Sequence, residues 1–271
     1  MRTRIILPII LILSTAWAAG YAHADILIVD PVIIKEKQGA TLNIGSIQPG
    51  ETIELIISPN SGYGKEAEWK QAILEWNNTN KKGITTQNSP IGEKSIISSI
   101  QTKNNTKTGT YIIPLTMKGE TDKLKDETYQ LLFKVEKELV KASITKSEIE
   151  GFVNEPLAFQ ILVVNDSSAE AVIDITPTLP LAWASPQKII INPHSFETIT
   201  LNVTPRFAGK KTFEIFLFHE TTGKEEAKLN GTLTAYPTLK DRYAAGFYGF
   251  PFYTISLISG YLTNALFSLL L

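Results

Sequence analysis

The amino-acid sequence predicts an all-β chain made of two tandem β-sandwiches followed by one C-terminal transmembrane helix. Short apolar alternations broken by Gly, Pro, Asn and Ser fill residues 25–237, which is the pattern of a sandwich. The later half of this region repeats the earlier half, and residues 243–271 carry no charge. Because 271 residues suffice for two ordinary domains, we expect sandwiches over residues 25–137 and 138–238.

Residues 1–24 have the three parts of an export signal peptide. Two arginines precede an apolar run over residues 5–13, and the small residues of "AHA" end at Ala24. We therefore predict cleavage after Ala24. A retained N-terminal anchor is the alternative, although the apolar run is too short to span a bilayer.

Composition limits the class of protein further. The chain has no cysteine, so an exported protein of this kind must be held by burial alone, which favours a prokaryotic surface. Its Ile and Lys content favours an archaeal source. The balance of 26 basic against 27 acidic residues gives no electrostatic footprint for nucleic acid.

Alternating β-branched and aromatic residues predict the strands, because a period of two presents one face to a core. The clearest segments are "TIELIIS" (52–58), "YIIPLTM" (111–117), "LAFQILVV" (157–164), "TITLNV" (198–203) and "TFEIFLF" (212–218). Residues 65–76 allow a second interpretation, since Trp69, Ile73 and Trp76 also share one face of a helix. The repeat favours a strand there, with a helical turn near Lys65 as the alternative.

The repeat has three landmarks in the same order in both halves. "QPGETIELIISPN" (48–60) parallels "NEPLAFQILVVND" (154–166), "QAILEWNN" parallels "EAVIDITP" with Ala72 against Ala171, and "KTGTYIIPLTM" parallels "AGKKTFEIFLF" with Gly109 against Gly209. Two of the landmarks keep a nearly constant offset of about 100 residues, which indicates two copies of one supersecondary unit.

The second copy carries a family resemblance. Trp183 and Ser185, the turn "NPHSFET" and Gly209 follow one another in an order that resembles an Ig-like module. This module lies beside carbohydrate-binding domains in some bacterial alpha-galactosidases and is repeated in many archaeal surface proteins. The resemblance is close over roughly residues 145–237 and looser over residues 25–136.

The resemblance implies tandem Ig-like sandwiches that act as spacers, packing partners or binding platforms, and it implies no activity. Two departures from the pattern stand out. His194 takes the place of the turn glycine, and the first copy has Gly83-Ile84 where the family has its tryptophan.

Each tryptophan has two interpretations. Trp183 is expected to plug the core or its rim, because a large ring covers apolar area, and the alternative is a ring that stacks on a sugar. Trp69 and Trp76 are expected to belong to the core of the first sandwich.

No catalytic, cofactor or metal signature is present in the sequence, so we expect a protein that is not an enzyme and uses no cofactor. With the signal removed, only His194 and His219 remain as histidines, and both are predicted to be solvated turn residues. A catalytic or metal-binding pair would require them to meet beside a carboxylate.

Five asparagines start N-glycosylation sequons. Asn77, Asn104, Asn165 and Asn230 are candidate acceptors, whereas Asn202 is the poorest because it lies inside a predicted strand. The alternative is that these are ordinary turn residues of a polar β protein.

The uncharged segment 243–271 predicts a membrane anchor. Residues 252–271 match the roughly 20 residues that a spanning helix needs, Pro251 precedes them, and aromatic residues cluster at one end. Gly260 and Asn264 would allow close approach of another membrane helix. A removable lipid-anchor signal and a segment broken at Gly260 are the alternatives. The chain is expected to have almost no cytoplasmic tail.

These features together predict a non-catalytic, single-pass protein of the cell membrane with its ectodomain outside. It would act in binding or adhesion or as a structural spacer, with membrane lipid, a membrane protein, or a surface glycan or protein as partners and no nucleic acid. An accessory subunit of an export or glycan-handling complex is the alternative. A hydrolase or a pilus-type chaperone is a more distant one.

Overall fold

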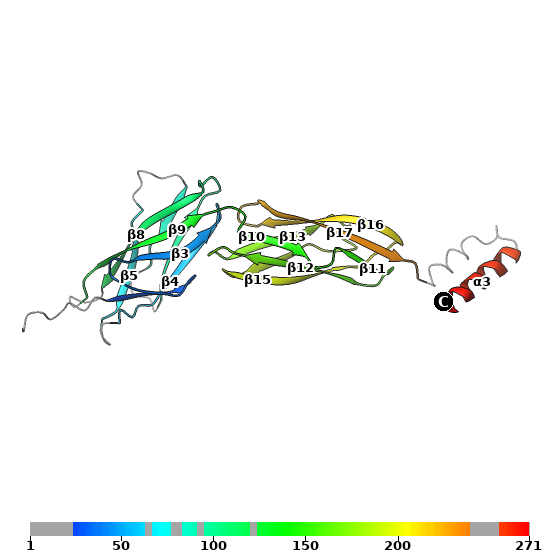
Figure 1. Ribbon diagram of the computed structural model, residues 1–271, viewed down its shortest axis with the longest axis horizontal. Coiled ribbons are helices and arrows are strands. Elements are labelled where there is room, and N and C mark those ends of the chain that lie inside the picture. Colours follow the sequence, from blue (N-terminus) through cyan, green and yellow to red (C-terminus); the bar gives the residue numbers. More distant parts are fainter. Residues whose placement is uncertain are drawn as a thin grey trace, which may run out of the picture. The chain divides into compact units, whose positions relative to one another are not determined.

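A computed structural model of the chain describes residues 24–62, 67–76, 83–90, 95–119, 124–238 and 255–270 (Figure 1). It divides into two compact units, Met1–Lys137 and Glu138–Leu271. The predicted signal peptide, the helical turn near Lys65, the candidate acceptor Asn77 and the aromatic start of the predicted anchor lie outside the described residues, apart from Ala24.

Unit 1 is built from two layers of strands. Its strands are β1 (Asp25–Asp30), β2 (Ile34–Lys37), β3 (Thr41–Ile47), β4 (Thr52–Ile57), β5 (Trp69–Leu74), β6 (Ile84–Gln87), β7 (Ile96–Thr102), β8 (Gly109–Gly119) and β9 (Glu127–Val135). One sheet has the order β2-β1-β4-β7-β6, and the other has the order β3-β9-β8-β5. All pairs are antiparallel except the parallel pair β3 and β9.

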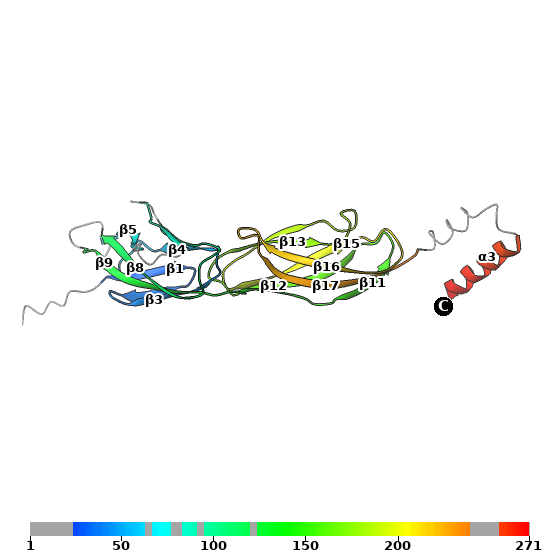
Figure 2. The ribbon, with the colours of Figure 1, turned by 90° about the horizontal axis from the view of Figure 1, so that it is seen from above.

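Unit 2 has the same kind of architecture. Its strands are β10 (Val140–Ile144), β11 (Glu148–Phe152), β12 (Leu157–Asn165), β13 (Ala171–Pro177), β14 (Gln187–Ile191), β15 (Ser195–Val203), β16 (Gly209–His219) and β17 (Glu225–Tyr236). The sheets have the orders β10-β12-β15 and β11-β17-β16-β13-β14, and both views show β16 and β17 running side by side (Figures 1 and 2).

The two units share one strand order, which agrees with the repeat in the sequence. The trio β1-β4-β7 of unit 1 corresponds to β10-β12-β15 of unit 2, and β3-β9-β8-β5 corresponds to β11-β17-β16-β13. The parallel pair recurs as well, because β11 runs parallel to β17 just as β3 does to β9. The three sequence landmarks fall on β4 and β12, on β5 and β13, and on β8 and β16.

The units differ at their edge strands. Unit 1 has the additional strand β2, which pairs with β1 and has no counterpart in unit 2. In unit 2, β14 pairs with β13, whereas in unit 1 the short strand β6 pairs with β7 in the opposite sheet. At the edge of β5, backbone amides donate hydrogen bonds instead to side chains of the segment after β6. The amide of Ala72 donates to Ser89 Oγ at 2.8 Å, and the amide of Leu74 donates to Asn88 Oδ1 at 2.7 Å.

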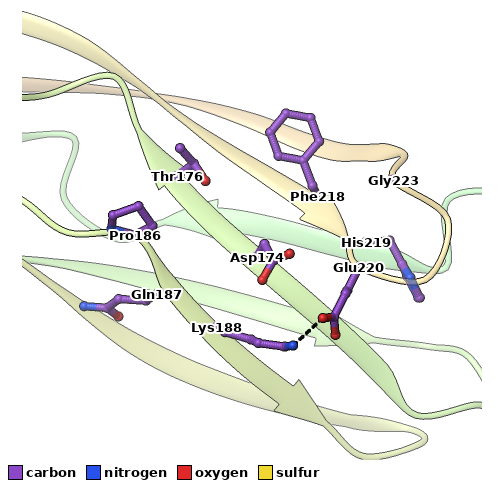
Figure 3. A pocket seen from close by; sticks show the side chains of 9 residues that line it. All are labelled: Asp174, Thr176, Pro186, Gln187, Lys188, Phe218, His219, Glu220 and Gly223. Carbon is purple, nitrogen blue, oxygen red and sulfur yellow. Dashed lines mark hydrogen bonds and ion pairs between the residues drawn. The ribbon is translucent and has the colours of Figure 1, made fainter. Parts of the chain in front are cut away.

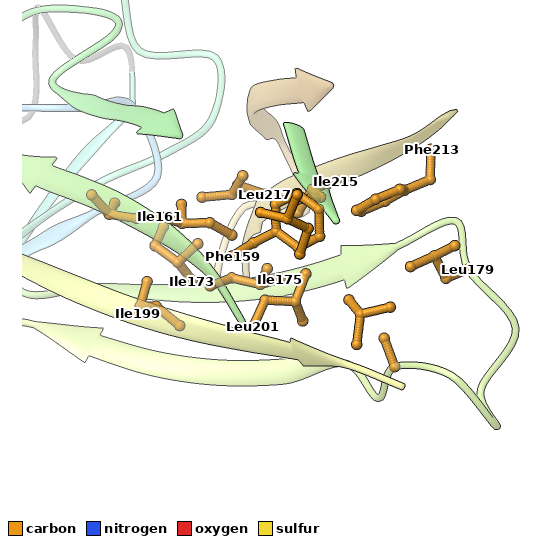
Figure 4. Close-up of a cluster of buried hydrophobic side chains, with 14 of the residues drawn as sticks. Phe159, Ile161, Ile173, Ile175, Leu179, Ile199, Leu201, Phe213, Ile215 and Leu217 are labelled. Carbon is orange, nitrogen blue, oxygen red and sulfur yellow. The ribbon is translucent and has the colours of Figure 1, made fainter. Parts of the chain in front are cut away.

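The core of unit 2 lies between its two sheets. Ile161 and Leu201 from one sheet meet Ile173 and Leu217 from the other, and all four are fully buried (Figure 4). The rings of Phe159 and Phe213 meet edge to face, with centroids 5.1 Å apart, the favoured geometry for aromatic pairs. Burial from both inner faces is what the strand alternation predicts.

The tryptophans of unit 1 differ in burial. Trp69 is buried in the core, and its indole donates to the carbonyl of Asp25 at 3.2 Å. It begins the strand β5, so the structure confirms the strand rather than the helix over the described residues 69–74. Trp76 is only partly buried and packs against Tyr111, with centroids 6.5 Å apart.

Helix α3 (Ile255–Leu270) is the helix that the structure describes near the C-terminus. It is 16 residues long, shorter than the predicted span of residues 252–271, of which residues 252–254 and 271 lie outside the described part. Within the described residues, no helix combines the length and the apolar character needed to cross a membrane.

Candidate functional site

An open groove lies on the outer face of the five-stranded sheet of unit 2. Its volume is about 440 Å³ (Figure 3). Strands β13, β14 and β16 and the hairpin after β16 supply its lining residues, which are Asp174, Thr176, Pro186, Gln187, Lys188, Phe218, His219, Glu220 and Gly223.

Strand alternation explains why Asp174, Lys188 and Phe218 point outward, whereas His219 faces the core. Along β16, Phe213, Ile215 and Leu217 are buried, so Phe216 and Phe218 between and after them emerge on the opposite face. The register then sets the neighbours. Asp174 on β13 pairs with Phe218 on one side and with Lys188 of β14 on the other.

Two partly exposed aromatic rings form the apolar part of this face. Phe216 and Phe218 stack with centroids 5.9 Å apart and planes inclined by 22°. Lys228 on the neighbouring strand places its Nζ 5.3 Å from the Phe216 centroid, and it forms a 2.7 Å ion pair with Glu214. Each ring therefore packs against the other, and Phe216 also lies beneath the Lys228 ammonium group. We call Phe216 and Phe218 with the groove the aromatic face.

The charged side chains of the groove are Lys188, Asp174 and Glu220, so two carboxylates accompany one ammonium group. Lys188 is hydrogen-bonded and ion-paired to Glu220, the contact drawn in Figure 3. The hydrogen bond to Glu220 raises the pKa of Lys188; desolvation opposes this rise, and attraction to Glu220 and Asp174 adds to it. A groove of this kind offers hydrogen-bond donors and acceptors beside an aromatic ring without a strong net charge. It therefore suits a neutral, hydroxyl-rich ligand.

The two histidines occupy different environments. His194 is exposed in the turn after β14, with Nε2 3.1 Å from Ser168 Oγ, as predicted for a turn residue. His219 ends β16 and is only 2% exposed, so the prediction of a solvated histidine is wrong for this residue. Strand alternation is the reason, because His219 continues the inward series of Ile215 and Leu217.

His194 has an unusual backbone conformation for a residue with a side chain. Its φ of 51° lies in the left-handed region, which ordinarily favours glycine.

Trp183 lies at the rim of the core. It is partly buried and packs against the buried cluster of unit 2, as the plug interpretation predicts. Its outer side is in contact with Phe207, at 6.3 Å between centroids, and with Lys211, whose Nζ is 5.0 Å from the ring centroid. Trp183 does not line the groove.

The candidate acceptor asparagines differ in how exposed their side chains are. Asn104 is exposed in a turn, and Asn230 is exposed on β17 opposite Glu214. Asn165 is 1% exposed, and its Nδ2 donates to the carbonyls of Ala169, Ile191 and Asn192 at 2.8 to 3.2 Å. A glycan on that nitrogen is incompatible with this burial, so the structure argues against Asn165 as an acceptor.

The remaining predicted site lies on α3. Gly260 and Asn264 are exposed one helical turn apart, and nothing lies within 4 Å of the position that a Cβ on Gly260 would occupy. Among the residues that the structure describes, no group of three His, Asp or Glu side chains is placed to hold a metal ion.

Sequence reasoning missed the aromatic face. The buried positions of "TFEIFLF" predict a strand, but its outward positions are also aromatic. A strand of an outer sheet that is apolar on both faces is a signal for a binding surface, because the solvent face of such a strand is ordinarily polar.

The fold shows that the chain contains two consecutive β-sandwich modules with one strand order. The chain was also compared with known proteins. No family model and no curated protein matches the sequence. Several solved structures do match. A chimeric titin Z1Z2 is 10% identical, with a TM-score of 0.37, over 80% of this chain and 98% of that chain.

Fibronectin(III)-like modules of Clostridium thermocellum CbhA are 9% identical, with a TM-score of 0.27, over 78% of this chain and 94% of that chain. The D0-D1 domain of intimin is 12% identical, with a TM-score of 0.26, over 78% of this chain and 98% of that chain. The two modules are defined by their own strand order and buried cores.

Proposed function

We propose that the chain is a non-catalytic, membrane-anchored cell-surface protein that binds a surface glycan through the aromatic face of unit 2. The observation that carries the binding role is the stacked pair of Phe216 and Phe218 beside an open groove in which Lys188 is ion-paired with Glu220. A sugar ring offers C–H groups that stack on an aromatic plane and hydroxyls that bond to the flanking Asp174, Lys188 and Gln187.

The open form of the groove favours an extended ligand. A groove on a flat sheet leaves both ends of a bound chain free, whereas small metabolites are ordinarily held in enclosed pockets. The expected affinity is modest, because few rings and few hydrogen bonds are engaged at once, and repeated presentation on a cell surface would raise it.

Anchoring to a membrane is the second part of the proposal. The uncharged segment 243–271 supports it, as does the row of exposed apolar side chains on α3, which includes Leu262, Leu266 and Phe267. Lipid would cover these apolar side chains favourably, and the helix satisfies its own backbone hydrogen bonds. Glycans at Asn77, Asn104 and Asn230 fit an ectodomain outside the cell.

Affinity electrophoresis tests the binding role. The full chain in lipid nanodiscs is run through native gels that contain cell-surface polysaccharides, and retardation identifies a bound glycan. Phe218→Ala and Phe216→Ala are each expected to weaken binding by about tenfold, equivalent to about 1.4 kcal/mol. Phe196→Ala, at an exposed phenylalanine outside the groove, is the matched control and should bind normally.

The binding role would be contradicted by a glycan that binds the three phenylalanine variants equally well. It would also be contradicted if no polysaccharide from the producing cell retards the folded full-length chain. Circular dichroism of each variant verifies that it is folded before binding is compared.

A second candidate is an accessory subunit of a membrane complex. Asn264 favours it, because an exposed amide in an apolar helix is costly in lipid unless another helix accepts its hydrogen bonds, and Gly260 allows that approach. Purification in mild detergent should recover a stoichiometric partner that Asn264→Leu loses. Recovery of the protein alone excludes the subunit role.

A further inference from the structure

The end of unit 2 at which β17 finishes is covered by large apolar side chains. They come from the β11–β12 end, the β13–β14 loop, the β15–β16 loop and the last residue of β17. We define this aromatic cap as Phe152, Leu181, Trp183, Phe207 and Tyr236.

Backbone hydrogen bonds join these segments into one surface. The amide of Thr204 donates to the carbonyl of Trp183 at 2.8 Å, which ties the β15–β16 loop to the β13–β14 loop. The amide of Asn154 donates to the carbonyl of Pro205 at 2.8 Å, and that of Val153 donates to the carbonyl of Tyr236 at 3.0 Å. These hydrogen bonds therefore hold the segments of the cap in fixed positions relative to one another.

The cap is strongly exposed. Leu181 and Phe207 are 75% and 74% exposed, and Phe152 and Tyr236 are exposed as a second ring pair with centroids 6.4 Å apart. Within the described residues 138–238, only two other large apolar side chains are exposed, Ile190 and Phe196. Concentration of apolar surface at one end of a polar sandwich indicates an interaction surface.

Basic residues border the cap. Arg206 and Lys210 are exposed beside Phe207, and Lys211 lies over the Trp183 ring. Arg206 also donates to Asn154 Oδ1 at 3.2 Å, which fixes its position on the loop. The acidic residues near the cap are Glu155 and Glu150, and Glu150 accepts a hydrogen bond from the Tyr236 hydroxyl at 3.1 Å. The basic side chains are therefore grouped around Phe207 and Trp183, where apolar tips beside them match the acyl chains and phosphates of a phospholipid interface.

The length of the chain brings this end close to the proposed anchor. Tyr236 is the last residue of β17, and the uncharged segment starts at residue 243. Seven residue steps separate Tyr236 from residue 243, and they span at most about 25 Å when fully extended, at about 3.3 to 3.6 Å per residue. A bilayer that holds residues 243–271 is therefore within reach of the cap, whatever path the connection takes.

We propose that the aromatic cap is a lipid-contacting surface that seats unit 2 on the phospholipid interface, with Leu181 and Phe207 as the inserted tips and Arg206 and Lys210 on the phosphates. This inference rests on the membrane anchoring proposed above. It adds a second attachment, which restrains the orientation of the sandwich at the membrane surface.

Site-directed spin labelling of the full chain tests the proposal. Because the chain has no cysteine, single replacements carry the label without any background change. The test positions are Leu181→Cys and Phe207→Cys, the control is the exposed Phe196→Cys, and Leu266→Cys reports on the anchor helix. Each is reconstituted in vesicles of phosphatidylcholine and phosphatidylglycerol, and collisions with oxygen and with a water-soluble nickel chelate are measured.

The proposal predicts that labels at positions 181 and 207 collide several-fold more with oxygen, relative to nickel, than the label at position 196. If position 266 is in lipid while positions 181 and 207 match position 196, the cap proposal is overturned and the anchor stands. If position 266 is in water, the anchor and the cap proposal fall together. Labels at 181 and 207 that are shielded from both reagents would show that protein covers the cap, which also overturns the proposal.

Discussion

Asn165 illustrates how one residue can satisfy a sequence motif and yet serve the fold. Its amide closes the end of β12 by bonding three carbonyls, while its Oδ1 accepts the amide of Ser167 at 2.9 Å. A buried polar cluster of this kind is costly to disrupt, because each group left unpaired loses about 1 to 3 kcal/mol. The sequon at Asn165 therefore coincides with a structural asparagine.

We predict that Asn165→Ala lowers the free energy of unfolding of unit 2 by about 3 kcal/mol, because it leaves several buried groups unpaired. Asn230→Thr, at an exposed sequon in the same unit, should stay within about 0.5 kcal/mol of the native protein. Urea unfolding followed by circular dichroism measures both. Equal effects of the two substitutions would refute the structural role of Asn165.

Tyr129 provides a pH dependence at the residue scale. It is fully buried, and its hydroxyl donates to Glu127 Oε2 at 2.8 Å. Burial, with the Glu127 hydrogen bond and the negative charges of Glu127 and Asp25, raises the pKa of Tyr129 well above its usual value near 10. The folded chain therefore keeps this proton under conditions in which the unfolded chain releases it.

We expect the stability of unit 1 to be unaffected by this group below about pH 10, where Tyr129 is neutral in both states, and to fall as the pH rises above that value. Tyr129→Phe should show a shallower alkaline decline, by up to about 1.4 kcal/mol per pH unit. Urea unfolding between about pH 9 and about pH 11 gives the two slopes, and identical slopes would disprove the assignment.

At the scale of single elements, the paired glycines show why the repeat is visible in the sequence. Gly109 begins β8 with a φ of 152°, and Gly209 begins β16 with a φ of 130°. A Cβ would meet no atom within 4 Å at either position, so space does not select glycine there. The backbone conformation selects glycine at these two positions, because L residues rarely adopt these φ angles.

Gly209→Ala should accordingly destabilise unit 2 by about 1 to 3 kcal/mol through backbone strain alone. Lys210→Ala, one residue further along the same strand and exposed, is the control and should change stability by less than about 0.5 kcal/mol. Thermal and urea unfolding distinguish them. A neutral Gly209→Ala would mean that the turn relaxes to another conformation.

Element prediction from the sequence succeeded where alternation was strong and failed where the choice of sheet decided the outcome. The strands around buried core positions such as Leu55, Ile161 and Leu217 follow from the period of two. The period of two does not predict that β14 pairs with β13 whereas β6 pairs with β7. The reason is that Ser89 and Asn88 satisfy the edge of β5 in a way that no local pattern reveals.

The candidate site was harder to predict than the fold. Phe216 and Phe218 lie in a segment that is expected to be a strand, but their stacking and their approach to Asp174 and Lys188 depend on register across three strands. The prediction for His219 is wrong because β16 continues two residues past its last inward leucine, Leu217, instead of ending in a turn. Registers and strand ends are tertiary properties, and a single sequence specifies them weakly.

At the scale of the whole molecule, two β-sandwiches follow one another and an apolar helix comes after them in the chain. Each module buries its core without a disulfide, and the chain has no cysteine to form one. The proposed division of labour assigns glycan binding to the aromatic face of unit 2, and it assigns membrane contact to the aromatic cap and to the segment after β17.

The most direct test of this account is the location of the chain in intact producing cells. Cells are treated with an external protease, and their membranes are then washed with alkaline carbonate. We expect that both sandwiches are digested from outside and that undigested chain stays in the membrane pellet. A chain that the wash releases, or that the protease reaches only after lysis, would contradict it.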